Sequence, residues 1–247
     1  MRGGEPDRPM TSSGVATHVA VLLPALNEEK TLPSILERMP GIIDRVVVAD
    51  NGSTDGTVAI ARAHGADVVH EPERGYGAAC LAGIRYLSQL PGPPAVVVFM
   101  DADGSDDPID IERIVRPIVE DEADMVLGVR RGVGGDVGTI LPHARFGNRL
   151  VLGMTHGLFG RAFQDLPPFR AIAFDQLERL EMDDRDWGWT LQMQIRAVRK
   201  GLRIVELDVS HRRRTAGVSK ISGSLAMSLR VGAKMFYTLA RERLRDG

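Results

Sequence analysis

This sequence of 247 residues has a single cysteine, no long apolar run and little net charge, and each of these features argues against a class of protein. It contains a single cysteine, Cys80, so no internal disulfide can form and a reducing compartment is favoured. No apolar run approaches the roughly 18 residues that a membrane-spanning helix needs. The net charge is only −2, which excludes a globally basic nucleic-acid-binding protein. The hydrophobic content of 43% is nevertheless enough for a substantial core.

The first 17 residues are polar, with glycine, proline and serine scattered among them. They lack the apolar centre of a signal peptide, so we expect a disordered leader over residues 1–17. A single domain over residues 18–221 and a C-terminal helix over residues 222–247 are expected to follow.

Short apolar runs alternate with segments of helical period through the first half of the chain. The runs predicted to be strands are 18–24, 45–50, 66–70, 95–100 and 123–128, and the predicted helices between them lie near 28–39, 54–64, 76–90 and 108–121. Nearly continuous valine, isoleucine and leucine runs are typical of strands covered on both faces. The alternation therefore predicts an α/β fold with a mainly parallel, Rossmann-like sheet and helices on both faces.

The second half is less regular. A glycine-rich segment, "GVGGDVG", predicts a mobile loop at 132–138. The later predicted elements are a helix at 144–159, a strand at 169–174, a helix at 189–200, a strand at 202–211 and a long helix from 222 to 245.

Polar residues cluster where the predicted strands end, at the edge of a parallel sheet where ligands bind. Asp101 and Asp103 stand two residues apart after a buried strand, where they can chelate Mg²⁺ or Mn²⁺ and leave other ligand positions to substrate phosphates. The alternative is a solvated turn or a helix N-cap, and Asp106 or Asp107 suits the capping role.

Three further segments are compatible with a bound nucleotide, and each also has a structural explanation. Segment 74–77, "RGYG", opens a helix and could present backbone N–H groups to an anion, or it could be a plain strand–helix turn. Asp50 ends a strand where a carboxylate can accept hydrogen bonds from a base or a ribose. Arg214 and Lys220 lie in a basic segment that could neutralise a diphosphate or be solvated.

Six segments occur together in an order that resembles a known family: "LLPALNEEKTL", "VVVADNGSTDGT", "RGYGAACLAGI", "FMDADGSDDP", "DMVLGVRR" and "RTAGVSK". From about Val19 to Leu239 the chain resembles family 2 glycosyltransferases of GT-A fold, and in particular the polyprenyl-phosphate mannose and glucose synthases. The resemblance implies a nucleotide-binding half over residues 18–130 and an acceptor half over residues 131–221.

The resemblance also implies roles for the residues that match family motifs. The P-x-x-N-E turn holds the nucleoside, Asp50 contacts the base, and the D-x-D motif binds Mg²⁺ or Mn²⁺ on the donor diphosphate, over which the R-x-x-G-x-S-K motif closes. The donor-binding residues are expected to be Pro24, Ala25, Leu26, Asn27, Glu28, Asp50, Arg74, Gly75, Ala102, Asp103, Arg214 and Lys220. The expected catalytic residues are Asp101, Asp103, Arg214 and Lys220, with Asp101 and Asp103 as metal ligands.

The expected acceptor-binding residues are Arg130, Arg145, Asp165, Arg170 and Gln192. Gln192 departs from the family pattern, because relatives often have a carboxylate at the position we align with it. Transfer to a hydroxyl needs a general base, whereas a phosphate monoester, with a second pKa of about 6, is already anionic. The glutamine therefore favours a lipid phosphate acceptor. The pair Pro167 and Pro168, where the family often has a glycine, leaves the pocket shape open.

The chain ends in a strongly basic region. From His211 to Gly247 there are nine lysine and arginine residues against two acids. Apolar residues recur at helical spacing through this region, at Ile221, Leu225, Leu229, Gly232, Phe236 and Leu239. A basic amphipathic helix suits contact with a membrane surface. The alternative is a helix packed on its own domain with a solvated basic face.

We therefore expect a metal-dependent, inverting glycosyltransferase that moves a hexose from GDP-mannose or UDP-glucose to polyprenyl phosphate at the cytoplasmic face of the membrane. The first alternative is a related enzyme that acts on a soluble hydroxyl or sugar-acid acceptor. A nucleotidyltransferase and an inactive nucleotide-sugar-binding module stay open as further alternatives. No nucleic-acid partner is expected.

Overall fold

The computed structural model describes residues 17–130, 142–212 and 225–245, and for 142–148 and 225–229 it describes the helical backbone alone. Its strands are β1 (Val19–Ala25), β2 (Arg45–Asp50), β3 (Asp67–His70), β4 (Val96–Phe99), β5 (Met125–Arg130), β6 (Arg170–Ala173) and β7 (Ile204–Val209). Its helices are α1 (Leu32–Glu37), α2 (Thr57–Ala63), α3 (Tyr76–Ser88), α4 (Ile111–Val119), α5 (Pro142–Phe159), α6 (Phe174–Arg179), α7 (Trp189–Arg199) and α8 (Leu225–Leu244), with a 3₁₀ turn at Pro108–Asp110.

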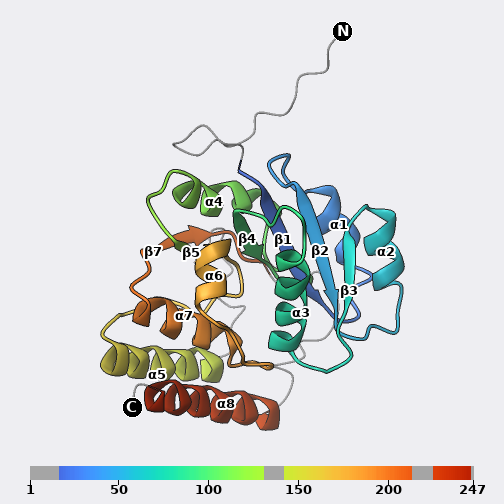
Figure 1. The fold of residues 1–247 in the computed structure, drawn as a ribbon. Coiled ribbons are helices and arrows are strands. Elements are labelled where there is room, and N and C mark those ends of the chain that lie inside the picture. Colours follow the sequence, from blue (N-terminus) through green and yellow to red (C-terminus); the bar gives the residue numbers. More distant parts are fainter. Residues whose placement is uncertain (1–16, 131–141, 213–224, 246–247) are drawn as a thin grey trace.

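The strands form one sheet in the order β3-β2-β1-β4-β6-β5-β7 (Figure 1). Strands β1 to β5 and β7 run in the same direction, and β6 runs antiparallel between β4 and β5. The mainly parallel α/β sheet expected from the sequence is therefore confirmed. The carboxyl ends of the parallel strands meet at one edge, and β6 begins at that edge with Arg170.

Helices cover both faces of the sheet because its strands are apolar on both sides. In β1, Val21 and Leu23 face a core that α1, α2 and α4 cover, whereas Ala20 and Leu22 face a second core under α3, α6 and α7. All four of these side chains are fully buried. The alternation of side chains along a strand thus supplies two cores from a single apolar run.

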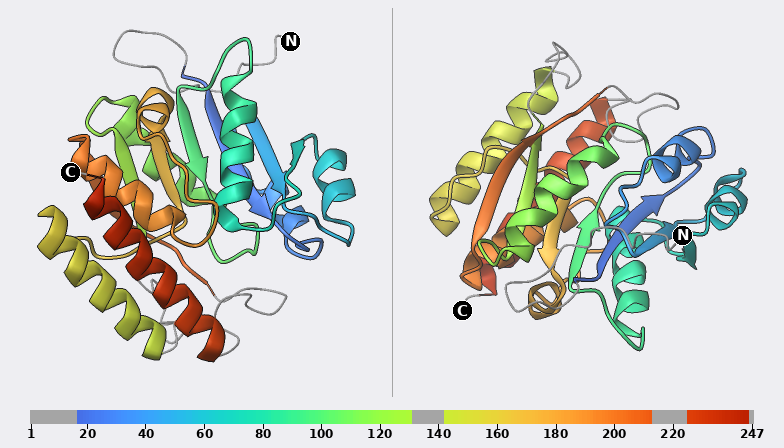
Figure 2. Two further views of the ribbon diagram at one scale, coloured as in Figure 1. Left: turned by 60° about the horizontal axis from the view of Figure 1, so that its bottom comes forward. Right: turned by 90° about the horizontal axis from the view of Figure 1, so that it is seen from above.

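The helices α5 and α8 form a further layer outside α7, away from the sheet (Figure 1, Figure 2). Val151 of α5, Leu191 and Ile195 of α7 and Leu239 of α8 make the small apolar cluster that joins the three helices. The expected C-terminal helix therefore exists, and Leu239 packs against its own domain.

The predicted elements agree with the structure in kind and order, with differences at their ends. The predicted helix at 108–121 is a 3₁₀ turn followed by α4, which ends at Val119, and the short helix α6 was not predicted. The expected leader lies, except for Thr17, outside the described residues, and so does the expected loop at 132–138. Of the helices that the structure describes, none has both the length and the apolar character needed to cross a membrane.

Candidate functional site

A pocket of about 370 Å³ opens beyond the carboxyl ends of the first four strands. Its walls come from the turns after β1, β2 and β4, the start of α3, the segment before α7 and the helix α8. The lining residues are Pro24, Ala25, Leu26, Glu28, Asn51, Arg74, Gly75, Tyr76, Ala79, Asp101, Ala102, Asp103, Asp186, Trp187 and Arg230. The structure thus brings most of the expected donor-binding residues into one pocket.

The turns after β1 and β2 are fastened to each other. Asn27 has a positive φ of 55°, and its side-chain Oδ1 accepts a hydrogen bond of 2.8 Å from the backbone N–H of Thr54. Its own backbone N–H donates to Ser53 Oγ at 2.9 Å, and that of Glu28 donates to Thr57 Oγ1 at 2.8 Å. Asn27 does not line the pocket. Its contacts hold the turn that presents Pro24, Ala25, Leu26 and Glu28 to the pocket.

Asp50 ends β2 and is almost completely buried. Its Oδ1 accepts a hydrogen bond of 3.0 Å from the backbone N–H of Ser53, and its Oδ2 lies 3.0 Å from His70 Nδ1. Burial alone would raise the pKa of Asp50, but the hydrogen bonds from Ser53 and His70 outweigh burial and hold the pKa below its usual value. The neighbouring Asn51 lines the pocket instead of Asp50.

The "RGYG" segment at the start of α3 is shaped by a close backbone contact. The Gly75 N–H donates to Asn51 Oδ1 at 2.8 Å, and the Ala78 N–H donates to the Arg185 carbonyl at 2.9 Å. A Cβ at Gly77 would lie 2.1 Å from the Asp184 carbonyl oxygen, and one at Gly75 would lie 2.1 Å from the Arg185 carbonyl oxygen. The glycines therefore allow segment 184–185 to pack on the helix start, and Arg74 and Gly75 line the pocket beside it.

Asp101 and Asp103 both line the pocket, in the turn after β4. Asp103 is 4% exposed, and its Oδ1 accepts a hydrogen bond of 2.9 Å from the Ser105 N–H. Among the described residues, the pocket lining includes four carboxylates, those of Glu28, Asp101, Asp103 and Asp186, and two cations, Arg74 and Arg230. Carboxylate oxygens gathered in one pocket are suited to a bound divalent cation.

The D-x-D pair fits a divalent cation that is shared with a substrate. Among the described residues, no group of three or more His, Cys, Asp and Glu side chains could hold a metal ion by itself. Mg²⁺ commonly takes one or two carboxylates from the protein and its remaining ligands from water and phosphates. Two carboxylates in one open pocket meet that requirement.

The remaining acids of this region have structural roles. Asp107 caps the turn at Pro108–Asp110 by accepting from the Ile109 N–H at 3.2 Å, as the capping interpretation expects. It also pairs with Arg38 and with Arg212, the latter at 3.0 Å. Asp106 Oδ1 lies 3.3 Å from His211 Nδ1, so this turn anchors the chain that leaves β7.

Arg130 and Asp165, two of the expected acceptor-binding residues, are joined to each other. Arg130 donates from Nε and Nη2 to the two carboxylate oxygens of Asp165, each at 2.7 Å. Burial alone would raise the pKa of Asp165, but the hydrogen bonds and charge of Arg130 hold it below its usual value. Neither residue lines the pocket, and both stand near the edge of the sheet at which β5 ends.

Arg170 and Gln192 are enclosed by protein. Arg170 has no exposed surface, donates to the Pro167 and Thr190 carbonyls, and has its pKa lowered to about 10 by burial. Gln192 is also fully buried, and its amide donates to Asp183 at 2.7 Å and to Glu242 of α8 at 2.8 Å. Neither side chain lines the pocket.

Three expected site residues cannot be placed. Arg214 and Lys220 lie outside the described residues, and Arg145 lies on α5 where the structure describes the backbone alone. Their roles stay predictions.

Six residues that line the pocket were not among the expected site residues: Asn51, Tyr76, Ala79, Asp186, Trp187 and Arg230. Asp186 and Trp187 stand in the segment "RDWGW" before α7, which the sequence analysis used only to align Gln192. Arg230 belongs to the C-terminal helix, and its guanidinium carbon lies 5.8 Å from the Trp187 ring centre. No local pattern marks Arg230, because the folding of α8 onto α7 places it there.

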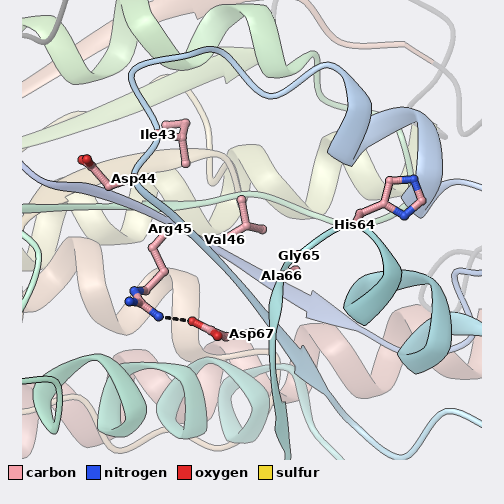
Figure 3. Close-up of a pocket in the computed structure, with 8 residues that line it drawn as sticks. All are labelled: Ile43, Asp44, Arg45, Val46, His64, Gly65, Ala66 and Asp67. Carbon is pink, nitrogen blue, oxygen red and sulfur yellow. Dashed lines mark hydrogen bonds and ion pairs between the residues drawn. The ribbon is translucent and has the colours of Figure 1, made fainter. Parts of the chain in front are cut away.

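A second hollow, of about 300 Å³, lies at the opposite edge of the sheet, where β2 and β3 begin (Figure 3). Figure 3 shows Arg45 turned toward Asp67, with which it forms an ion pair. Ligands of parallel sheets bind at the other edge, so the first pocket is the candidate site.

Comparison with known proteins identifies the family of the chain. A family model described as Glycosyl transferase family 2 matches residues 20–180. The chain is 40% identical over 218 residues to an uncharacterized glycosyltransferase of Mycobacterium tuberculosis, covering 85% of this chain and 93% of that protein. It is 33% identical over 225 residues to the polyprenol monophosphomannose synthase of Mycolicibacterium smegmatis, covering 83% of this chain and 81% of the synthase.

Solved structures share the fold. Glucosyl-3-phosphoglycerate synthase from Mycobacterium tuberculosis, in complex with phosphoglyceric acid, matches with a TM-score of 0.70 and 26% identity, covering 91% of this chain and 80% of the synthase. The same synthase with Mn²⁺, uridine-diphosphate-glucose and phosphoglyceric acid matches with a TM-score of 0.69 and 24% identity, covering 92% of this chain and 80% of that one. The resemblance stated from the six sequence segments is thereby confirmed.

Proposed function

The chain belongs to glycosyltransferase family 2, and we propose that it transfers a hexose, with inversion, from GDP-mannose or UDP-glucose to polyprenyl phosphate. The observation that carries this proposal is the pocket in which the turns after β1 and β2 meet the D-x-D turn after β4. A nucleoside diphosphate bound along these turns would bring its diphosphate beside Asp101 and Asp103.

The donor side of the proposed site would be built mainly from turns of the backbone. Pro24, Ala25, Leu26, Asn51 and Arg74 would enclose the nucleoside, and Gly75 lets the chain approach closely at the start of α3. Asp50 and Asn27 would act by fixing these turns, since both are engaged in hydrogen bonds within the protein. Arg214 and Lys220 are proposed to offset the charge of the leaving diphosphate, as the sequence motif implies.

Asp101 and Asp103 would hold Mg²⁺ or Mn²⁺ against the donor diphosphate. When bound, the metal ion would supply positive charge where negative charge develops on the leaving group. The structures of glucosyl-3-phosphoglycerate synthase with Mn²⁺ support this proposal through their similarity in fold. The burial of Asp103 and its hydrogen bond to Ser105 keep one carboxylate fixed in the pocket wall.

Polyprenyl phosphate is favoured as acceptor by the similarity to the polyprenol monophosphomannose synthase. A phosphate monoester is anionic near pH 7 and attacks without a general base. Arg130 and Arg145 remain proposed acceptor-binding residues, and Asp165 and Arg170 would act by shaping the neighbourhood of Arg130. Gln192 carries no weight in this choice, because its amide is buried away from the pocket.

A soluble hydroxyl acceptor is the second candidate, and Asp186 is the observation that favours it. This carboxylate lines the same pocket as the D-x-D pair, where it could accept the proton of an attacking hydroxyl. The fold similarity to glucosyl-3-phosphoglycerate synthase points in the same direction. Replacing Asp186 with asparagine should therefore abolish transfer to a hydroxyl acceptor and leave transfer to a phosphate acceptor within a few-fold of wild type.

Contact with the cytoplasmic face of a membrane is proposed through the outer surface of α5 and α8. Five of the six exposed large hydrophobic side chains in the described part of the chain lie on these two helices: Leu150, Leu158, Phe236, Tyr237 and Leu244. The exposed cation Arg149 stands on α5, next to Leu150 in the sequence. Apolar side chains flanked by cations suit the boundary between acyl chains and anionic head groups.

The test of the proposed function is transfer of radiolabel from GDP-mannose or UDP-glucose, with Mn²⁺, into an organic-soluble product in the presence of polyprenyl phosphate. The same donors are incubated with phosphoglyceric acid in parallel to test the soluble class. Asp103→Ala should abolish transfer and remove the Mn²⁺-dependent thermal stabilisation by the nucleoside diphosphate. Nucleotide binding that is indifferent to Mn²⁺ and to this substitution would contradict the proposed site.

A further inference from the structure

The C-terminal helix contributes a cation to the candidate site. Arg230 of α8 lines the same pocket as Asp101 and Asp103, and its guanidinium lies over Trp187, 5.8 Å from the ring centre. A guanidinium that lies over an aromatic ring still has N–H donors available for hydrogen bonds to a ligand. Arg230 is exposed, so those donors are accessible from the pocket.

Arg230 differs from its neighbours on α8 in having no anionic partner among the described residues. Lys234 pairs with the buried Asp184 at 2.9 Å, and Arg241 and Arg245 both pair with Asp183. Those three cations fasten the helix to the segment before α7. None of the ion pairs within the described part of the chain includes Arg230, which leaves its charge for a ligand of the pocket.

The segment that these ion pairs hold against α8 also lines the pocket, through Asp186 and Trp187. Asp184 has no exposed side-chain surface, accepts the Asp186 N–H at 2.9 Å through Oδ1 and meets Lys234 through Oδ2. A Cβ at Gly188 would lie 2.2 Å from the hydroxyl oxygen of Thr238 on α8, so helix and segment are in direct contact. Trp187 and Arg230 therefore keep a fixed relation to each other and to the site.

The charge of the pocket indicates what Arg230 binds. Arg74 and Arg230 are the cations among the described lining residues, and either of them would attract an anionic ligand of the pocket. The donor diphosphate would lie by the D-x-D pair and its metal. Arg74 stands with the turns that would hold the nucleoside, whereas Arg230 comes from the opposite end of the chain and a separate wall.

We propose that Arg230, which lies over the Trp187 ring, binds the anionic group of the acceptor, so that α8 forms part of the acceptor site. The inference rests on the proposed function and deepens it, because it requires an acceptor that carries a phosphate or a carboxylate. A lipid phosphate and a soluble phosphate would both present this chemistry.

Binding is measured by calorimetric titration of farnesyl phosphate, a short polyprenyl phosphate, and separately of 3-phosphoglycerate, into protein saturated with nucleoside diphosphate and Mn²⁺. Arg230→Ala should weaken binding of one probe by about tenfold or more, the effect of losing a hydrogen bond to a charged group. The probe that responds identifies the acceptor as lipid or soluble. Arg230→Lys should restore part of the affinity, because it restores the charge but not the planar group.

Arg243→Ala is the matched control, since Arg243 is an exposed cation on the same helix, about 20 Å along its axis from Arg230. It should bind both probes as the wild type does. If both variants lost the same affinity for a probe, the loss would come from the overall charge of α8, and the proposal would be overturned. The proposal would also be overturned if Arg230→Ala bound both probes as tightly as the wild type does. It would be overturned as well if Arg230→Ala lost as much affinity for the nucleotide as for the probe, or if the wild type bound neither probe.

Kinetics separate this inference from the proposed function. In steady-state transfer, Arg230→Ala should raise the acceptor KM about tenfold while the donor KM and kcat stay within about threefold of wild type. Absence of any transfer by the wild type would contradict the proposed function and leave the binding titrations to decide the role of Arg230.

Discussion

The strongest prediction concerns Glu242, which decides whether α8 is an integral part of the domain. Its side chain is fully buried, and Oε1 accepts hydrogen bonds from Gln192 at 2.8 Å and from Arg196 Nη2 at 2.9 Å. Its Oε2 accepts from Arg196 Nε at 3.0 Å. Glu242→Ala would remove the carboxylate and leave the guanidinium of Arg196, a residue only 5% exposed, without its main counter-charge.

Loss of one partner of a buried ion pair costs about 3–5 kcal/mol. We expect the lower end, about 3 kcal/mol, because Arg196 also meets Asp183 at 2.8 Å and the Leu180 carbonyl at 3.1 Å. For a chain of this size the loss corresponds to a fall in Tm of roughly 6–12 °C. Urea unfolding and differential scanning calorimetry measure it, with Glu112→Ala on the exposed face of α4 as control.

A double variant, Arg196→Met with Glu242→Leu, tests the cause of the loss. It should be less destabilised than the sum of the two single variants, because removing both charges leaves neither of them uncompensated. A Glu242→Ala protein whose Tm matches that of Glu112→Ala would refute the reasoning and would show that α8 contributes little to the stability of the domain.

Three further predictions use other parts of the structure. Gly77→Ala should destabilise the fold by about 1–3 kcal/mol in urea unfolding, since its Cβ would lie 2.1 Å from a backbone carbonyl, whereas Gly92→Ala, where a Cβ meets open space, should change little. The lowered pKa of Asp165 adds stability at neutral pH that is lost as the pH falls below about 4. Asp165→Asn should therefore lower the midpoint of urea unfolding at pH 7 and make that midpoint decrease less between neutral and acidic pH. A dependence of the midpoint on pH that matches the wild type would contradict this. Phe236→Glu should reduce flotation with anionic liposomes more than Ile109→Glu does, and equal effects would exclude a specific membrane-facing surface.

The fold was predictable because its signals are local and repeated. The run at 18–24 is apolar at nearly every position, and only a strand covered on both faces buries such a run. The position of β6 between β4 and β5, antiparallel to both, was not predictable. Pairing between strands depends on contacts far apart in the chain, which leave no mark on the period of a single segment.

The part of the pocket around Asp101 and Asp103 was predictable for a similar reason. Asp101 and Asp103 follow a buried strand, and the carboxyl ends of parallel strands must meet at one edge, so the sequence order alone places them near the turns of Asn27 and Asn51. The remaining wall of the pocket was not. Gln192 was expected in the site and is buried against Glu242, while Arg230, which no motif marks, lines the pocket.

The amino-acid sequence by itself determined the α/β architecture, the family and the acidic pair at the end of β4, because each depends on short patterns that fix local structure and on the direction in which parallel strands point. The tertiary structure alone decided that Arg230 of α8 and the segment before α7 line the pocket, and which side chains of α7 and α8 face each other. That choice depends on how the two helices pack, with Asp184 bound to Lys234 and Glu242 bound to Arg196 across the interface. Contacts between residues some fifty positions apart determine this packing. The spacing of residues along either segment does not predict it.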